Sequence, residues 1–304
     1  MNQRRVVLLS LLMAAGLPGC AAFNHDAPDS PVPQTTATPP ETPPRVALVL
    51  GSGGPRGYAH IGVMKVLEEA GVEVDLVVGS SVGSLLGAFW ASGFNAAQLD
   101  AAARSGGPLT LFDPSLFADR GWIRGQRLQD YVNDRLGNAL LEQLPRRLIV
   151  TATRRDNKQP VFFQQGNAGV AVRASSAVTG VISPVGIRGT EYEDADEYLP
   201  VAVRAARQAG ARFVIAVDVS ARAGKAPPGT SPRLLERDAQ RRSRIDPEIR
   251  LADFLIHPDM DYAASPRSSY FVQARIAGEV AAREQMPELL EKLRLTGWTA
   301  RSPD

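Results

Sequence analysis

Residues 45–83, RVALVLGSGGPRGYAHIGVMKVLEEAGVEVDLVVGSSVG, decide the fold of this chain. The β-branched, mostly apolar run at 45–50 ends in a glycine-rich turn, after which apolar residues recur at helical spacing until Gly71. This order predicts a strand, a loop and a helix. Residues 74–90 repeat it with a second apolar strand, the turn at 79–83 and an apolar helix. Two strand–helix units in succession predict a parallel sheet covered by helices.

The second turn, Gly79-Ser80-Ser81-Val82-Gly83, has the form G-x-S-x-G. Small residues two positions before and after the serine allow a sharp bend from strand to helix, which presents the hydroxyl at the helix N-terminus. Ser81 has both glycines at this spacing, whereas Ser80 does not. The sequence therefore predicts Ser81 as a nucleophile, Gly79 and Gly83 as its elbow, and Ser80 as a turn residue that makes a local hydrogen bond.

The first turn contains consecutive glycines ahead of a helix. Backbone N–H groups in such a loop are free to point at an anion, and the helix dipole adds positive potential behind them. An acyl-transfer enzyme needs donors of this kind beside its serine as an oxyanion hole. We assign that role to the backbone around Gly53, Gly54, Arg56 and Gly57. The Arg56 side chain either orients the loop, for example through a salt bridge, or attracts a phosphate head group.

A nucleotide-binding loop is the competing interpretation of these glycines, and the spacings argue against it. The phosphate-loop pattern G-x-x-x-x-G-K-[ST] is absent, and Arg56 stands where the third glycine of G-x-G-x-x-G belongs. The acidic residue that binds ribose is also missing, because the second strand ends at Gly79 in the serine turn.

The two turns together resemble those of the patatin-like phospholipases, with a glycine loop followed by Arg56-Gly57 and the serine of G-x-S-x-G 24 residues after Gly57. The similarity runs over about residues 45–220 and includes 58–63, 172–177 and 214–220. The resemblance implies an α/β fold, a three-layer α/β/α sandwich with a mostly parallel central sheet. It also implies hydrolysis of (lyso)phospholipid acyl esters by a Ser–Asp dyad through an acyl-enzyme, with no metal or organic cofactor.

The same resemblance points to the base. The family's aspartate lies in D-G-[GA] after a segment like 183–185 and a short hairpin, and before a proline-led helix, and Asp194 occupies that place. Ala195 stands where the family has glycine. A positive φ there would strain alanine and displace the aspartate, whereas close packing alone would tolerate it. Asp196 is the fallback base, and a catalytically weak patatin-fold lipoprotein that binds lipid or envelope components is the alternative function.

A Ser–Asp–His triad is a second arrangement to weigh, because Ser81, Asp194 and His257 occur in the chain order of α/β-hydrolases. The glycine loop and Ser81 are too close together in the sequence for the usual layout of that fold. His60 lies early on the first predicted helix, where a half-buried structural role is expected. The dyad is therefore the preferred hypothesis, and His257 is the residue that tests it.

Residues 1–19 have the layout of a secretory signal peptide, with two arginines followed by an apolar run too short to span a bilayer. The run ends in Leu17-Pro18-Gly19-Cys20, which resembles a bacterial lipobox and implies cleavage before Cys20 and a diacylglycerol on its sulfur. A plain leader with an incidental cysteine is the alternative. Ala21 favours the outer membrane over the inner one. Residues 20–44, rich in Pro and Thr, predict an extended tether, which leaves 45–304 as the acyl hydrolase domain.

The charge of the chain gives no sign of nucleic-acid binding. Lys and Arg total 34 against 32 Asp and Glu, a near balance that argues against electrostatic capture of nucleic acid. The single cysteine excludes an intramolecular disulfide and a cysteine metal cluster, and no metal-ligand spacing occurs. The expected partners are a phospholipid or lysophospholipid substrate and the membrane, reached through the lipid anchor.

Later segments complete the predicted sandwich. We expect a helix at 126–136, strands at 148–152 and 161–163, and a final helix or helix pair at 270–293 with a boundary at Pro287. Residues 221–244 are rich in Gly, Pro and Arg with interspersed acids. A solvated loop and helix is expected there, rather than a surface for anionic lipid heads.

Overall fold

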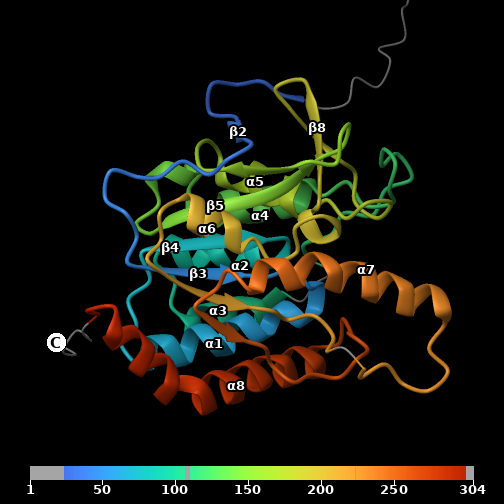
Figure 1. Cartoon of the computed structure of the whole chain (residues 1–304). Helices are drawn as coiled ribbons and strands as arrows, with labels where there is room; N and C mark the ends of the chain where they lie inside the picture. Colours follow the sequence, from blue (N-terminus) through green and yellow to red (C-terminus); the bar gives the residue numbers. More distant parts are fainter. Residues whose placement is uncertain (1–23, 107–109, 223, 299–304) are drawn as a thin grey trace, which may run out of the picture.

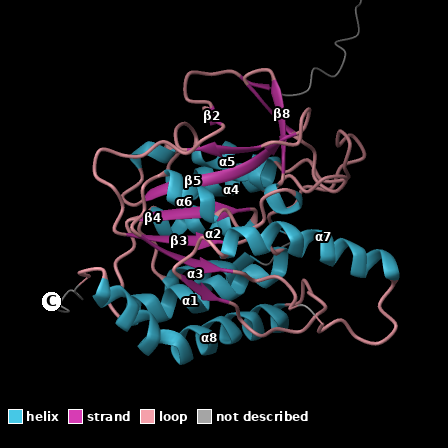
Figure 2. Ribbon diagram, in the orientation of Figure 1, coloured by secondary structure: helices cyan, strands magenta, loops and turns pink. Residues whose placement is uncertain are grey.

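A computed structural model describes residues 24–106, 110–222 and 224–298. Within these residues the chain forms a three-layer α/β/α sandwich around one sheet of ten strands (Figures 1 and 2). The strand order is β1-β7-β8-β5-β4-β3-β9-β10, with β6 paired to β5 and β2 paired to β6. The predicted α/β class and the mostly parallel centre of the sheet are confirmed.

The centre of the sheet is parallel. Its five strands, in spatial order, are β5 (Arg147–Arg154), β4 (Leu76–Ser80), β3 (Val46–Leu50), β9 (Phe213–Val217) and β10 (Phe254–Ile256). Every residue of β3, β4 and β9 is buried, as expected for strands that have both faces covered. Alternate residues of β3 enter two separate cores, Leu48 and Leu50 one of them and Ala47 and Val49 the other.

The sheet becomes antiparallel beyond β5. β6 (Pro160–Phe163) and β8 (Thr190–Glu193) both pair with β5, and β7 (Val185–Ile187) pairs with β8. Thr153 of β5 faces Glu193, the residue before Asp194, and Thr151 faces Ser80, the residue before Ser81. Residues 81 and 194 therefore follow strands that flank the same end of β5.

Helices cover both faces of the sheet. One core lies beneath α1 (Tyr58–Glu69), α2 (Val82–Ala91), α4 (Gln126–Leu136), α5 (Ala168–Ser175) and α8 (Ser268–Leu295). The other lies beneath α6 (Val203–Gln208) and α7 (Pro232–Ile249). α3 (Ala96–Gly106) packs beside α1, and short 3₁₀ helices form η1 (Gly54–Gly57), η3 (Leu141–Gln143) and η4 (Ala195–Glu197). The predicted helix at 126–136 and strands at 148–152 and 161–163 are confirmed as α4, β5 and β6.

The last helix is continuous, so the predicted boundary at Pro287 is wrong. α8 runs through this proline without a break. A proline inside a helix removes one backbone hydrogen bond. Met286, Leu289 and Leu293, on both sides of Pro287, are nevertheless buried in the core. Their packing holds the helix together across the missing bond, because tertiary burial supplies most helical stability in proteins.

Two glycines bring α1 and α8 into backbone contact at the lower edge of the molecule in Figure 1. A Cβ atom placed on Gly278 would lie 2.0 Å from the carbonyl oxygen of Ala59. One placed on Gly62 would lie 2.0 Å from the carbonyl oxygen of Arg275. Any larger side chain at either position must push the two helices apart.

Residues 24–34 lie along the antiparallel side of the sheet, whereas the sequence predicted a tether over 20–44 that extends away from the domain. β1 (Asn24–His25) pairs with β7, and β2 (Pro33–Gln34) pairs with β6. Arg188 donates from Nη2 to the carbonyl oxygen of Ser30 at 2.9 Å and from Nε to that of Pro31 at 3.2 Å. Proline-rich backbone keeps its carbonyl acceptors, so side-chain donors of the domain can bind it.

The predicted signal peptide at 1–19 and the predicted lipidation site Cys20 lie outside the described residues. Among the helices that the structure describes, none combines the length and the apolar character needed to cross a bilayer.

Replacing Gly278 by alanine should destabilise the fold. The new methyl group has no space between α8 and α1, and overpacking of this kind costs about 1–3 kcal/mol. Urea unfolding should show a lower midpoint for Gly278→Ala. Gln273→Ala, at an exposed position of the same helix, is the matched control and should change the free energy of unfolding by less than about 0.5 kcal/mol. Equal midpoints for Gly278→Ala and the parent protein would contradict the close contact.

Candidate active site

Ser81 is the single residue between β4 and α2, and its backbone is strained, with φ 54° and ψ −122°. The glycines on either side permit this turn. A Cβ atom on Gly83 would lie 2.2 Å from the carbonyl oxygen of Leu50, and one on Gly79 would lie 2.5 Å from Cα of Ser84. The two glycines of the G-x-S-x-G pattern therefore allow close backbone contacts in a sharp strand-to-helix turn, as the sequence predicted.

The structure brings Ser81 and Asp194 together. Ser81 Oγ donates a hydrogen bond to Asp194 Oδ2 at 2.6 Å, and the two residues are only 8% and 4% exposed. The Asp194 amide donates to the carbonyl oxygen of Ala177 at 2.9 Å, which fixes the backbone. Asp194 Oδ1 accepts from the amide of Asp196 at 2.7 Å, which fixes the carboxylate. The serine and the aspartate that the sequence selected thus form a buried, oriented pair.

Ala195 occupies its position without strain. It is the first residue of η4, it is fully buried, and its φ is not among the positive values in the chain. The family's glycine is therefore not required here for a left-handed backbone, and close packing accommodates the methyl group. The Ser81–Asp194 hydrogen bond is intact beside it.

The fallback base Asp196 is engaged elsewhere. Its Oδ1 accepts from Nη2 of Arg241 at 2.7 Å and also from the hydroxyl of Ser52. Arg241 donates in addition to the carbonyl oxygen of Ser52 at 2.9 Å. This side chain on α7 is only 17% exposed, so the prediction of a solvated helix is wrong at this position. Arg241 ties the glycine loop to the segment that carries Asp194.

The two carboxyl groups have opposite pKa shifts. Burial, followed by the negative charge of Asp196, raises the pKa of Asp194, although the Ser81 hydroxyl and the Asp196 amide oppose the rise. Burial also acts to raise the pKa of Asp196, but the Arg241 guanidinium outweighs it and holds that pKa below the usual range. Asp194 is therefore the more basic of the pair, and it is the one that contacts Ser81.

The glycine loop is fixed at its start and has free donors at its centre. The amides of Gly51 and Ser52 donate to backbone carbonyls of β9 and of residue 200, at 3.0 and 2.9 Å. Within the part of the chain that the structure describes, the amides of Gly53 and Gly54 have no acceptor. A Cβ atom on Gly57 would lie 2.4 Å from Val82, the residue after Ser81. The loop thus lies against the start of α2 with two unpaired N–H groups.

His60 and Arg56 hold this loop in place. His60 is fully buried with Nε2 2.7 Å from the carbonyl oxygen of Gly51, and burial lowers its pKa to about 4. The imidazole is therefore neutral near pH 7, and its N–H can donate to that carbonyl. Arg56 donates from Nη2 to the carbonyl oxygen of Tyr262. This contact agrees with a loop-orienting role, made through a hydrogen bond and not a salt bridge.

Two further serines support Ser81. The Ser81 amide donates to the hydroxyl of Ser175 at 2.9 Å, and Ser175 is fully buried at the end of α5. Ser80 donates to the carbonyl oxygen of Leu199 at 3.1 Å and contacts the Thr151 hydroxyl. Ser80 is thus a buried structural residue. In the sequence, Ser175 stands out only as part of the stretch of family similarity at 172–177, because no local pattern shows which backbone group a distant hydroxyl contacts.

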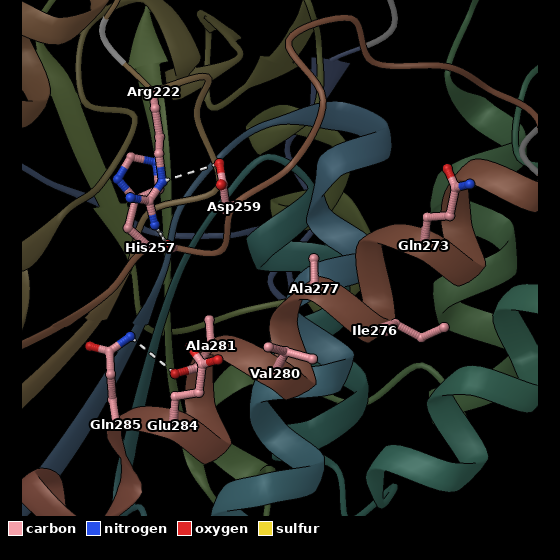
Figure 3. A pocket seen from close by; sticks show the side chains of 10 residues that line it. All are labelled: Arg222, His257, Asp259, Gln273, Ile276, Ala277, Val280, Ala281, Glu284 and Gln285. Carbon is pink, nitrogen blue, oxygen red and sulfur yellow. Dashed lines mark hydrogen bonds and ion pairs between the residues drawn. The ribbon is translucent and has the colours of Figure 1, made fainter. Parts of the chain in front are cut away.

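His257 does not complete a triad with Ser81 and Asp194. Its Nε2 lies 3.0 Å from the carbonyl oxygen of Ser220, and its Nδ1 lies 3.8 Å from the Asp218 carboxylate. Figure 3 shows His257 lining a different, open pocket beside α8, together with Arg222, Asp259 and residues of that helix. None of the predicted catalytic or oxyanion residues lines this pocket. Among the described residues, no group of three or more His, Cys, Asp or Glu side chains could hold a metal ion.

Several known proteins are similar to this chain. A family model for patatin-like phospholipases matches residues 48–199. An uncharacterized NTE family protein of Mycobacterium tuberculosis is 37% identical over 196 residues, which cover 62% of this chain and 53% of that protein. Lysophospholipase NTE1 of Coccidioides immitis is 31% identical over 189 residues, which cover 60% of this chain and 12% of that protein. The crystal structure of VipD from Legionella pneumophila has the same fold, with a TM-score of 0.50 and 11% identity over 90% of this chain and 72% of that chain.

A three-layer α/β/α sandwich with a serine at a strained strand–helix turn defines a class of α/β proteins with a nucleophile elbow. Within that class, the chain belongs to the patatin-like phospholipase family. It spans about half the length of the mycobacterial relative and a much smaller part of the fungal one.

Substituting Asp196 by asparagine should lower the pKa of Asp194. The change removes the negative charge that raises this pKa and leaves the Arg241 cation in place. Carbon-13 NMR of the carboxyl groups would follow the titration of Asp194 directly. Glu236→Gln removes a charge from an exposed position on the same helix as Arg241 and should leave the Asp194 titration unchanged. An unchanged or higher pKa in Asp196→Asn would show that the two carboxyl groups do not interact as described.

Proposed function

We propose that this protein is a serine hydrolase that cleaves fatty-acyl esters of phospholipids or lysophospholipids. The observation that carries the proposal is the 2.6 Å hydrogen bond from Ser81 Oγ to Asp194 at the strained turn after β4. Family membership supports it. The similarity to a fungal protein named lysophospholipase supports the choice of substrate class.

In the proposed reaction Asp194 acts as general base. Its carboxylate accepts the Ser81 hydroxyl proton while Oγ attacks the carbonyl carbon of the ester. The tetrahedral oxyanion receives hydrogen bonds from the free amides of Gly53 and Gly54. Collapse breaks the ester C–O bond, and the proton on Asp194 passes to the leaving alcohol. The fatty acyl group stays on Ser81 as an ester.

The second half of the reaction repeats these steps with water. Asp194 takes a proton from a water molecule whose oxygen attacks the acyl-enzyme carbonyl, and the proton returns to Ser81 Oγ as the fatty acid leaves. Because Asp194 must be ionised to act as base, the rate should rise as pH increases through its raised pKa. Asp196→Asn should move that rise to lower pH, since it lowers the same pKa.

The alternative function, a catalytically weak protein that binds lipid or envelope components, depends on Ala195 distorting the site. That residue sits in an unstrained backbone beside an intact Ser81–Asp194 hydrogen bond. The geometry therefore favours the hydrolase.

Replacing either member of the pair should abolish hydrolysis. Ser81→Ala removes the nucleophile and Asp194→Asn removes the base, and loss of such residues costs about 10³-fold or more in rate. Fatty-acid release from mixed phospholipid vesicles and hydrolysis of a soluble short-chain ester are the two assays. His257→Gln is the matched control, and it should retain activity because His257 contacts Ser220 and Asp218.

Three results would contradict this assignment. Activity that survives Ser81→Ala rules out the nucleophile, and loss of activity in His257→Gln with an unchanged fold rules out the dyad. A wild-type protein inert on vesicles and soluble esters alike would favour the lipid-binding function. In that case Ala195→Gly should produce a large gain in rate, whereas the proposal expects little change.

We further propose that Cys20 carries a diacylglycerol that holds the enzyme on a bacterial cell envelope, on the outer membrane in preference to the inner one. The support is the leader-like run before Leu17-Pro18-Gly19-Cys20 and the alanine that follows it. Metabolic labelling with palmitate should mark the wild-type protein, and Cys20→Ser should abolish the label. Labelling that persists in Cys20→Ser would contradict the anchor.

A further inference from the structure

The hairpin between α3 and α4 presents apolar side chains to solvent. Leu116 is fully exposed, and Phe117 is 86% exposed; they are the two most exposed large apolar residues that the structure describes. Trp122, on the returning arm, is 57% exposed. Figure 1 shows this green segment projecting at the right of the molecule, away from α8. Such exposure is unfavourable in water, and contiguous apolar groups of this kind mark interaction sites.

The hairpin is an ordered structure. Pro114 and Ile123 form an antiparallel bridge, and the Ser115 amide donates to the carbonyl oxygen of Trp122 at 2.9 Å. At its base, Asp113 accepts from the amides of Gly125 and residue 126, at 2.6 and 3.1 Å, and so caps the start of α4. These hydrogen bonds keep the hairpin ordered while its apolar side chains are exposed.

Hydrogen bonds connect this hairpin to the Ser81–Asp194 pair. The amides of Trp122 and Ile123 both lie 3.0 Å from the carbonyl oxygen of Val181. Val181 belongs to segment 175–183, which begins with the Ser175 hydroxyl that accepts from the Ser81 amide. The same segment includes Ala177, which accepts from the Asp194 amide, and Val178, which is exposed. The apolar tip and the reactive pair are thus built on one short stretch of chain.

One exposed arginine lies beside the base of the hairpin. Arg124, next to the hairpin's base, is exposed and makes no ion pair with any residue that the structure describes. Arg120, near the tip, is paired with Asp119 and Glu191. A phosphate group could therefore bind Arg124 without displacing an internal partner.

We propose that residues 114–123, the docking hairpin, insert into the surface of a phospholipid bilayer and so place Ser81 at the lipid. This inference rests on the proposed function, because a lipid hydrolase must meet its substrate at such a surface. Leu116 and Phe117 suit the acyl region, Trp122 suits the interface, and Arg124 suits the phosphate layer. The apolar group comprises three exposed side chains, Leu116, Phe117 and Trp122, whereas a stable protein interface uses about 20–30 residues from each partner.

The test uses the full chain with Cys20→Ser, so that no lipid anchor contributes. Trp122 is the exposed tryptophan, whereas Trp90 and Trp298 are buried. Vesicles of phosphatidylcholine and phosphatidylglycerol that contain brominated acyl chains should therefore quench the emission of Trp122. The double variant Leu116→Ser/Phe117→Ser should lose most of this quenching. Its hydrolysis of vesicle lipid should fall about tenfold or more, while its hydrolysis of a soluble short-chain ester stays within about twofold of the parent.

The matched control is Ile276→Ser/Val280→Ser, which removes two exposed apolar side chains from α8 and should change neither readout. Unchanged quenching and vesicle hydrolysis in the hairpin variant overturn the proposal, and so does equal loss on the soluble ester. Quenching in a wild-type protein that hydrolyses neither substrate would contradict the proposed function but support the docking hairpin.

Discussion

The hydrogen bond between Ser81 and Asp194 joins the two halves of the sheet. Ser81 follows a strand of the parallel half, and Asp194 follows a strand of the antiparallel half, with β5 paired to both. A shift of β8 by one residue along β5 would turn Asp194 to the opposite face of the sheet. The reactive pair therefore depends on the register of the whole sheet, as well as on the strained turn that presents the serine.

Asp194 and Asp196 differ in pKa because their charged surroundings differ. A buried carboxylate is costly unless it is paired or hydrogen-bonded. Asp196 has the Arg241 guanidinium as a partner, and its charge is stabilised. Asp194 has the Ser81 hydroxyl and one backbone amide, and its pKa is raised. Arg241 thus stabilises the charge of Asp196, and Asp194 beside Ser81 remains the more basic carboxylate. Arg241 also donates to the carbonyl oxygen of Ser52 and so holds the loop that contains the unpaired amides.

The docking hairpin and β1 both lie at the antiparallel end of the sheet. Arg120 of the hairpin is paired with Glu191 on β8, and β8 is linked through β7 to β1, which begins at Asn24. Cys20 precedes Asn24 by four positions. The lipid proposed on Cys20 would therefore join the chain four residues before β1. The pairing of β1 and β2 with the sheet differs from the long tether that composition alone predicts.

The sequence by itself determined the strand–turn–helix units, Ser81 at its elbow and, by family resemblance, Asp194. These features follow from local patterns, because periodicity and turn glycines reflect the backbone at their own positions. Only the tertiary structure decided that Arg241 reaches the glycine loop, that β1 and β2 join the sheet, and that α8 continues through Pro287. It also decided which apolar side chains are exposed to solvent, among them Leu116 and Phe117. Each of these depends on contacts between residues far apart in the chain, which no local pattern encodes.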